Sequence, residues 1–224
     1  MNMRRLLSVA AAALAVACAV QSASALTTID TTPSWNGYSY IYPFGHPDTA
    51  TYGQTVTAPS VDTRLDSFSF YMDLDPSVVF RGYVYAWDGA KATGPALYTS
   101  ADTAGPGAGA FYEVAFNTGG VNLTGGNAYV LFCSVSGIAG QQVGGSWGYI
   151  WDSNAYPGGE LQYTNNDDDP SLWTSQNWGT FISGDMAFKA TFNSPQVIPE
   201  PVTVCGLLMG LGSIAVAARR RLRG

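Results

Sequence analysis

The sequence predicts an all-β domain built as a two-sheet sandwich, and three observations support that prediction. Apolar and polar side chains alternate along short segments, as they do on strands with one buried face. The middle of the chain lacks the three-to-four-residue apolar period of an amphipathic helix. Glycine and proline pairs separate the alternating segments at short intervals, as the turns of antiparallel sheets require.

Roughly nine short strands are expected, and the alternation justifies each of them in turn. Phe68, Phe70 and Met72, for example, share one face of the second. In chain order the expected strands are 52–57, 65–73, 79–87, 96–99, 112–116, 129–135, 149–151, 160–163 and 186–192. Antiparallel pairing without crossover helices favours closure as a jelly-roll-like sandwich. The absence of an exact internal repeat argues against a β-helix or a propeller.

The segments between these strands carry turn residues. Glycine supplies positive φ angles at hairpin connections, and proline presets the first turn position. The expected turns are Asp75-Pro76, Asp88-Gly89, Gly94-Pro95, Gly105 to Gly109, Gly119-Gly120, Gly125-Gly126 and Pro157-Gly158-Gly159.

Charge and cysteine content exclude several classes of protein. Residues 26–198 hold fifteen acidic and four basic residues, a formal net charge of −11 against −6 for the whole chain. Nucleic acid is therefore a poor partner, because phosphate binding needs clustered Lys and Arg. Cys133 is alone in this stretch and alternates with Leu131 and Val135. We expect it to be a buried packing residue, with no internal disulfide.

The N-terminus has the plan of a secretory signal peptide. Residues 1–25 combine a basic start, an apolar stretch over 6–20 and small residues at the 23–25 cleavage signal. The mature chain is expected to begin near Leu26.

The C-terminus combines three further elements. Pro199-Glu200-Pro201 precedes the charge-free apolar run 202–218, which is followed by Arg219, Arg220, Arg221 and Arg223. At about 1.5 Å per residue the run spans roughly 26 Å, near the short end of what crosses a hydrocarbon core. We expect a transmembrane helix over 202–218 in the inner membrane, with the arginines on the cytoplasmic side.

A signal peptide, a folded middle and this tripartite tail resemble the bacterial PEP-CTERM exported proteins, whose tail is also called an ice-binding protein C-terminal domain. The resemblance implies three parts: the signal peptide 1–25, a β-sandwich over 26–194 and a sorting segment over 195–224. It implies that an exosortase recognises Pro199, Glu200 and Pro201, with the basic residues Arg219, Arg220 and Arg221 completing the signal. A plain membrane anchor is the alternative for the tail.

The same resemblance implies a place and a role. The protein would be exported across the inner membrane of a Gram-negative bacterium, anchored there transiently or permanently, and delivered to the cell surface or extracellular matrix. Association with exopolysaccharide or biofilm is implied as well.

Aromatic residues provide the candidate ligand-binding set. Flat rings stack on sugars, and the surrounding amides and carboxylates bind hydroxyl groups, so polysaccharide is the expected ligand. The candidates are Trp147, Tyr149, Trp151, Trp173 and Trp178. The first three share one strand face, and such a face can equally belong to a core. A second aromatic cluster comprises Trp35, Tyr38, Tyr40 and Tyr42.

Few residues here could support a metal or a catalytic centre. Asp167, Asp168 and Asp169 offer adjacent oxygen ligands for structural calcium, with a solvated loop as the alternative. His46 is the sole histidine, so zinc sites and Ser-His-Asp machinery lack parts. The predicted function is a non-catalytic surface protein. Its alternatives are a hydrolase of polysaccharide using Glu160 with an aspartate, or a protein-binding adhesive module on a plain anchor.

Overall fold

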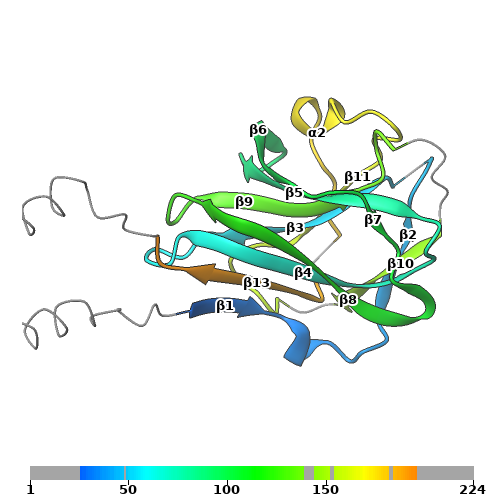
Figure 1. The fold of residues 1–224 in the computed structure, drawn as a ribbon, viewed down its shortest axis with the longest axis horizontal. Helices are drawn as coiled ribbons and strands as arrows, with labels where there is room; N and C mark the ends of the chain where they lie inside the picture. The colour runs from blue at the N-terminus through cyan, green and yellow to red at the C-terminus, as the bar shows by residue number, and fades with distance from the viewer. Residues whose placement is uncertain (1–25, 48, 139–143, 152–153, 182–183, 196–224) are drawn as a thin grey trace, which may run out of the picture. The chain divides into compact units, whose positions relative to one another are not determined.

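The structure is a computed structural model that describes residues 26–47, 49–138, 144–151, 154–181 and 184–195. Strands dominate these residues, and helix is limited to the 3-10 turn η1 (Thr32–Ser34) and the short α2 (Leu172–Ser175). Two antiparallel sheets pack face to face as a β-sandwich (Figure 1). The all-β, two-sheet prediction is therefore confirmed.

Seven strands form the first sheet. They are β1 (Leu26–Asp30), β2 (Tyr40–Phe44), β4 (Arg64–Leu74), β8 (Gly107–Asn122), β10 (Gly145–Trp151), β12 (Gly184–Met186) and β13 (Phe188–Asn193). The order is β1-β13-β4-β10-β12, with β2 paired to β10 and β8 paired to β4. One edge of β4 pairs with β8, and its other edge pairs first with β13 and then with β10.

Six strands form the second sheet. They are β3 (Thr51–Thr57), β5 (Val79–Trp87), β6 (Ala92–Thr99), β7 (Thr103–Ala104), β9 (Ala128–Ser134) and β11 (Leu161–Thr164). The order is β11-β3-β9-β5-β6, with β7 paired to β5. Every predicted strand coincides with an observed one, although 186–192 is interrupted at Ala187. The sequence prediction missed β1, β2 and β7: β1 and β2 lie at sheet edges, and Pro43 interrupts the pattern of β2.

Two of the predicted glycine turns are bulges instead. The register between β4 and β8 shifts between Leu65 and Ser67 and again between Met72 and Leu74. The glycines opposite these shifts have positive φ and are Gly107, Gly109, Gly119 and Gly120. A bulge adds residues to one strand without ending it. The predicted strand 112–116 therefore extends through both glycine segments and becomes the 16-residue β8.

One apolar core lies between the sheets. Its largest fully buried side chains are Trp147, Tyr52, Tyr149, Phe44, Phe68, Phe70, Phe80, Phe188, Phe192, Leu65 and Met72. Phe132 is also fully buried but belongs to a second cluster on the outer side of the second sheet. Cys133 belongs to the core, and burial raises the pKa of its thiol well above the ordinary value. The packing role predicted for this cysteine is confirmed.

Candidate ligand-binding face

Four of the five predicted ligand-binding aromatics are buried. Trp147 and Tyr149 are both 0% exposed in the main core, while Trp173 is 4% and Trp178 is 8% exposed. Trp151 differs, with 52% of its surface exposed. A ring needs an open face to stack on a sugar. The stacking platform predicted from these residues is therefore wrong for the four buried rings, which pack the protein interior.

Trp173 and Trp178 are buried because α2 and the chain after it cover the outer side of the second sheet. There they contact Phe132, with ring centroids 5.1 and 5.2 Å away. Both indoles have hydrogen-bond acceptors: Trp173 Nε1 donates to Thr51 Oγ1 (3.1 Å) and Trp178 Nε1 donates to the carbonyl of Trp173 (2.9 Å). These tryptophans hold a surface segment in place.

The three adjacent aspartates do not converge. Asp167 Oδ1 lies 3.0 Å from His46 Nδ1, Asp168 Oδ1 accepts from the Gly137 amide, and Asp169 Oδ1 accepts from the amide of Ser171. Within the described ranges, no group of three His, Cys, Asp or Glu side chains could hold a metal ion. Asp167 and Asp168 both lie beside the His46 ring, with Asp168 Oδ1 3.8 Å from Nε2, whereas Asp169 turns to its own local partner. The calcium site predicted at Asp167, Asp168 and Asp169 is not formed in this structure.

The sorting residues Pro199, Glu200, Pro201, Arg219, Arg220 and Arg221 lie outside the described residues, as do 1–25 and 202–218. Within the part of the chain that the structure describes, no helix has the length and apolar character needed to span a membrane.

Exposed aromatic rings gather instead where the second predicted cluster lies. Tyr40 and Tyr42 project outward from β2 and are 52% and 56% exposed, while Ile41 between them is buried at 4%. Tyr38, in the loop before β2, is 70% exposed. Together with half-buried neighbours these residues form what we call the aromatic face: Trp35, Tyr38, Tyr40, Tyr42, Tyr71 and Phe111.

Four rings of the aromatic face, those of Trp35, Tyr40, Tyr71 and Phe111, contact one another across the outer side of the first sheet. The Trp35 ring lies 5.3 Å from Tyr71 and 5.2 Å from Phe111, and Phe111 lies 6.3 Å from Tyr40. These residues come from β4, β8, β2 and the loop before β2. Edge-on and tilted contacts of this kind are favourable for aromatic pairs, so the rings support each other's orientation.

Local hydrogen bonds order the loop that carries Trp35 and Tyr38. The side-chain oxygen of Asn36 accepts from the amides of Tyr38 (3.0 Å) and Ser39 (2.8 Å), which is an Asx-type turn. Trp35 Nε1 donates to the carbonyl of Ser39 (2.8 Å). Gly37 adopts a φ of 85°, which glycine reaches without steric cost. The loop backbone and the Trp35 ring are therefore held in place before any ligand binds.

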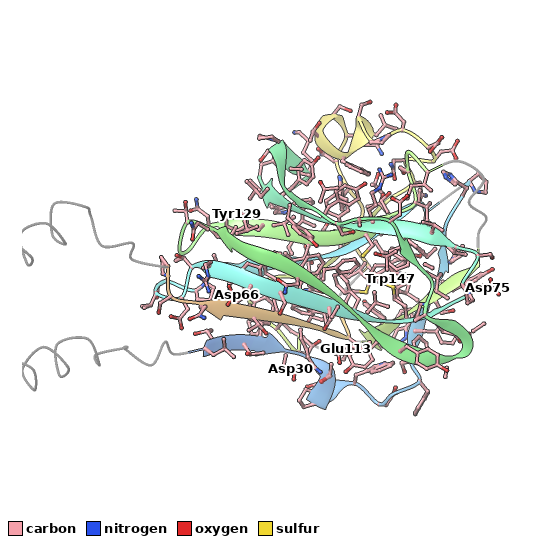
Figure 2. All side chains as sticks on the ribbon, in the orientation of Figure 1. Asp30, Asp66, Asp75, Glu113, Tyr129 and Trp147 are labelled. Carbon is pink, nitrogen blue, oxygen red and sulfur yellow. The ribbon has the colours of Figure 1, made fainter. Side chains whose placement is uncertain are left out.

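A polar network borders the rings. Glu113 Oε1 accepts from Ser69 Oγ (2.7 Å), and its Oε2 accepts from Tyr71 OH (3.1 Å) and Lys189 Nζ (3.2 Å). Burial acts to raise the pKa of Glu113, but the hydrogen bonds from Ser69, Lys189 and Tyr71 bring it below its ordinary value. Glu113 is therefore ionised at neutral pH. Figure 2 shows it on β8 at the middle of the sheet.

Gly148 allows Trp35 to lie directly on β10. A Cβ placed on Gly148 would stand 2.9 Å from Trp35 Cζ2 and 2.9 Å from Ala187 Cβ. Both distances are too short to keep without movement. We therefore expect Gly148→Ala to displace the Trp35 ring and to lower the free energy of unfolding by about 1–3 kcal/mol, measured by urea denaturation.

Gly144→Ala is the matched control, since no atom lies within 4 Å of the Cβ it would add. The Trp35 indole N–H resonance should shift in Gly148→Ala and stay in place in the control. Equal stability and an unmoved resonance in both variants would show that Trp35 does not depend on Gly148.

Asp185 is the aspartate that bears on the hydrolase alternative, because its pKa is influenced by Glu160. Burial raises the pKa of Asp185, hydrogen bonds oppose this, and the neighbouring Glu160 carboxylate adds a smaller increase. A raised carboxyl pKa beside a second acid is typical of glycosidases. However, Asp185 is only 1% exposed, and its two oxygens accept from Gln54 Nε2 (2.8 Å) and the Tyr156 amide (2.9 Å). A general acid must reach its substrate, and in this conformation Asp185 links β12 to β3 instead.

No protein-family model and no curated protein matches the chain. Among solved structures, the clostridial cysteine protease Cwp84 after propeptide cleavage is similar at 12% identity and a TM-score of 0.47, covering 76% of this chain and 40% of that one.

Two further solved structures are similar. The cysteine protease and lectin-like domains of Cwp84, a surface layer associated protein of Clostridium difficile, match at 11% identity and a TM-score of 0.45, over 68% of this chain and 36% of that chain. The infectious bursal disease virus Gx strain structure matches at 15% identity and a TM-score of 0.29, over 90% and 50%. This chain thus spans less than two thirds of each, and these TM-scores assign no function.

Proposed function

We propose that the protein is an exported, non-catalytic surface or matrix protein whose β-sandwich associates with polysaccharide. The observation that supports this most directly is the aromatic face, where solvent-exposed rings lie beside hydrogen-bonding groups. Sugars present apolar ring faces together with hydroxyl groups, and this mixture is complementary to both. The test is co-sedimentation of the protein recovered from its native host with that host's purified exopolysaccharide. Retention of the protein in the supernatant would contradict the proposal.

The remaining parts of the proposal rest on the sequence. The sandwich has a jelly-roll path and is preceded by the signal peptide 1–25. The tail 195–224 holds it at the inner membrane of a Gram-negative bacterium through a helix over 202–218. An exosortase-type enzyme then recognises Pro199-Glu200-Pro201, and the protein reaches the cell surface or matrix.

Processing at the tail makes a specific prediction. The wild-type protein recovered from the extracellular fraction should begin near Leu26 and have lost the segment after the Pro-Glu-Pro motif. The double variant Pro199→Ala/Glu200→Ala should keep its tail and stay in the membrane fraction, because the recognition motif is gone. Intact-mass spectrometry of both fractions measures this. Uncut chains ending at Gly224 in both strains would make the tail a plain anchor.

The hydrolase alternative rests on the sequence, which offers Glu160 with an aspartate as the two carboxylates. It requires release of reducing sugar from the host polysaccharide, abolished by Glu160→Gln without loss of binding. Binding without any release of reducing sugar supports the non-catalytic proposal.

A further inference from the structure

Both chain ends of the described sandwich lie at the same end of the molecule. Leu26 at the start of β1 pairs with Asn193 at the end of β13, and Asn193 also pairs with Arg64 on β4. The positions at which the leader and the tail join are therefore side by side at one end. Figure 2 shows Asp66 near this end and Asp75 at the opposite end of the sandwich.

The aromatic face lies toward the end marked by Asp75. Tyr71 is about seven residues further along β4 than Arg64, which at ~3.3 Å per residue is roughly 23 Å. Trp147 pairs with both Met72 of β4 and Ile41 of β2, which places β2 in register with this part of the sheet. The aromatic face is therefore remote from the two chain ends of the described sandwich.

We propose that the aromatic face is the site at which this protein binds polysaccharide, and that its ligand is an uncharged polysaccharide chain lying along β2. The inference rests on the proposed function and specifies its site and ligand class. Tyr40 and Tyr42 are the principal stacking residues. Tyr38 lengthens the binding surface, so that it contacts a further sugar unit of the polysaccharide.

The charges around the face select an uncharged ligand. Lys189 is the cation that borders the rings, and its Nζ is already paired with Glu113 Oε2 at 3.2 Å. Asp73 projects from the same side of β4, and Asp30 lies opposite Lys189 in the register of β1 and β13. A polyanion would meet an acidic surface on a domain of net charge −11. Ring stacking and hydrogen bonds to hydroxyl groups need no net charge on the ligand.

The geometry of the face also limits the entropy lost on binding. The backbone at Tyr40 is fixed by its pairing with Gly148, and the loop before it is held by the Asn36 hydrogen bonds. Tyrosine side chains have few rotatable bonds, so they contribute contact area at a low cost in conformational entropy. Pre-positioned rings of this kind favour binding by reducing the ordering that the ligand must induce.

Affinity electrophoresis of the full mature protein through gels containing single polysaccharides tests the inference. The probes are the host exopolysaccharide, hydroxyethyl cellulose, dextran and galactomannan as uncharged polymers, and alginate as a polyanion. We compare the wild type with Tyr40→Ala/Tyr42→Ala, and with Trp151→Ala as a control that removes an equally exposed ring outside the aromatic face. Urea midpoints of all three proteins establish that they are folded.

We expect an uncharged polymer to retard the wild type and Trp151→Ala, and the double variant to lose at least about tenfold in affinity. Equal retardation of a folded double variant would overturn the site while leaving the proposed function standing. Retardation by alginate alone would overturn the ligand class. Failure of every polymer, including the host's own, to retard the wild type would overturn the proposed function and this inference with it.

Discussion

Replacing Trp147 with alanine is expected to lower the free energy of unfolding by about 3–5 kcal/mol, the cost of truncating a large aromatic residue in a core. Trp147 is 0% exposed, and its ring lies 4.9 Å from Phe70, 5.1 Å from Phe44 and 5.7 Å from Tyr52. These partners come from both sheets, so the cavity left by alanine would open at the junction of the sandwich. Urea denaturation monitored by circular dichroism measures the loss.

Two variants make this prediction specific. Trp151→Ala, on the same strand but at a 52% exposed residue, should cost only about 0.5–1.5 kcal/mol, chiefly from its edge-on ring contact with Tyr149 at 4.7 Å. Trp147→Phe should cost less than Trp147→Ala, since among the described residues Trp147 Nε1 has no hydrogen-bond acceptor and phenylalanine keeps a ring while removing this donor. An unchanged stability of Trp147→Ala together with lost polysaccharide binding would return Trp147 to the ligand platform expected from the sequence.

Asp185→Asn is expected to destabilise the sandwich by about 1–3 kcal/mol at neutral pH, because a buried donor is left facing another donor. Asp185 accepts from Gln54 Nε2 and from the Tyr156 amide, while Gln54 Oε1 accepts from the Met186 amide at 2.9 Å. Asparagine provides one oxygen where the network requires two, and Gln54 cannot rotate its amide without losing Met186. Urea denaturation at several pH values measures the difference between the two proteins.

The pH dependence of that difference has a definite sign. Burial is the largest influence on Asp185 and raises its pKa above the ordinary value of 3.8, so the folded state holds this proton more tightly than the unfolded chain. Its contribution to stability is present below the ordinary pKa and is lost as the pH rises through the raised value. The advantage of the wild type over Asp185→Asn should therefore shrink from pH 4 toward pH 7.

Asp75→Asn provides a control of opposite sign. Hydrogen bonds from the Ser77 hydroxyl and amide lower the pKa of Asp75. Its stabilisation is present above the ordinary carboxyl pKa and is lost as the pH falls. The free energy of unfolding of the wild type should therefore increase relative to that of Asp75→Asn as the pH rises. Parallel pH profiles for wild type and Asp185→Asn would contradict the assignment of a raised pKa to Asp185.

Much of the fold could be read from local pattern. Residues such as Phe68, Phe70 and Met72 alternate strictly, and a strand places alternate residues on one face. The bulges of β8 could not be read in the same way, because Gly119-Gly120 has the composition of a turn. Whether two glycines end a strand or bend it depends on whether a partner strand continues alongside them, and β4 does.

The sequence predicted only part of the candidate site. Both aromatic clusters were recognised, but their burial was not. Trp147 and Tyr40 have similar polar and aromatic neighbours along the chain, and alternation says which residues share a face without saying which face is covered. Gly148 is the one signal of this burial in the sequence. A glycine between two aromatic residues leaves room for another side chain, here Trp35, to pack on the outer side of the strand.

The sequence by itself determined the all-β class and the acidic, single-cysteine character of the domain, and the targeting plan proposed for the two ends rests on it alone. The class and the character of the domain follow from composition and from the alternation of apolar and polar residues along strands, which are properties of the chain alone. Only the tertiary structure decided that Trp147 packs inward while Tyr40 and Tyr42 face solvent, and that Asp167, Asp168 and Asp169 do not form a group that could hold a metal ion. Burial and convergence depend on which strands lie together, and residues distant in sequence, such as Ile41, Met72 and Trp147, meet only when the sheets form.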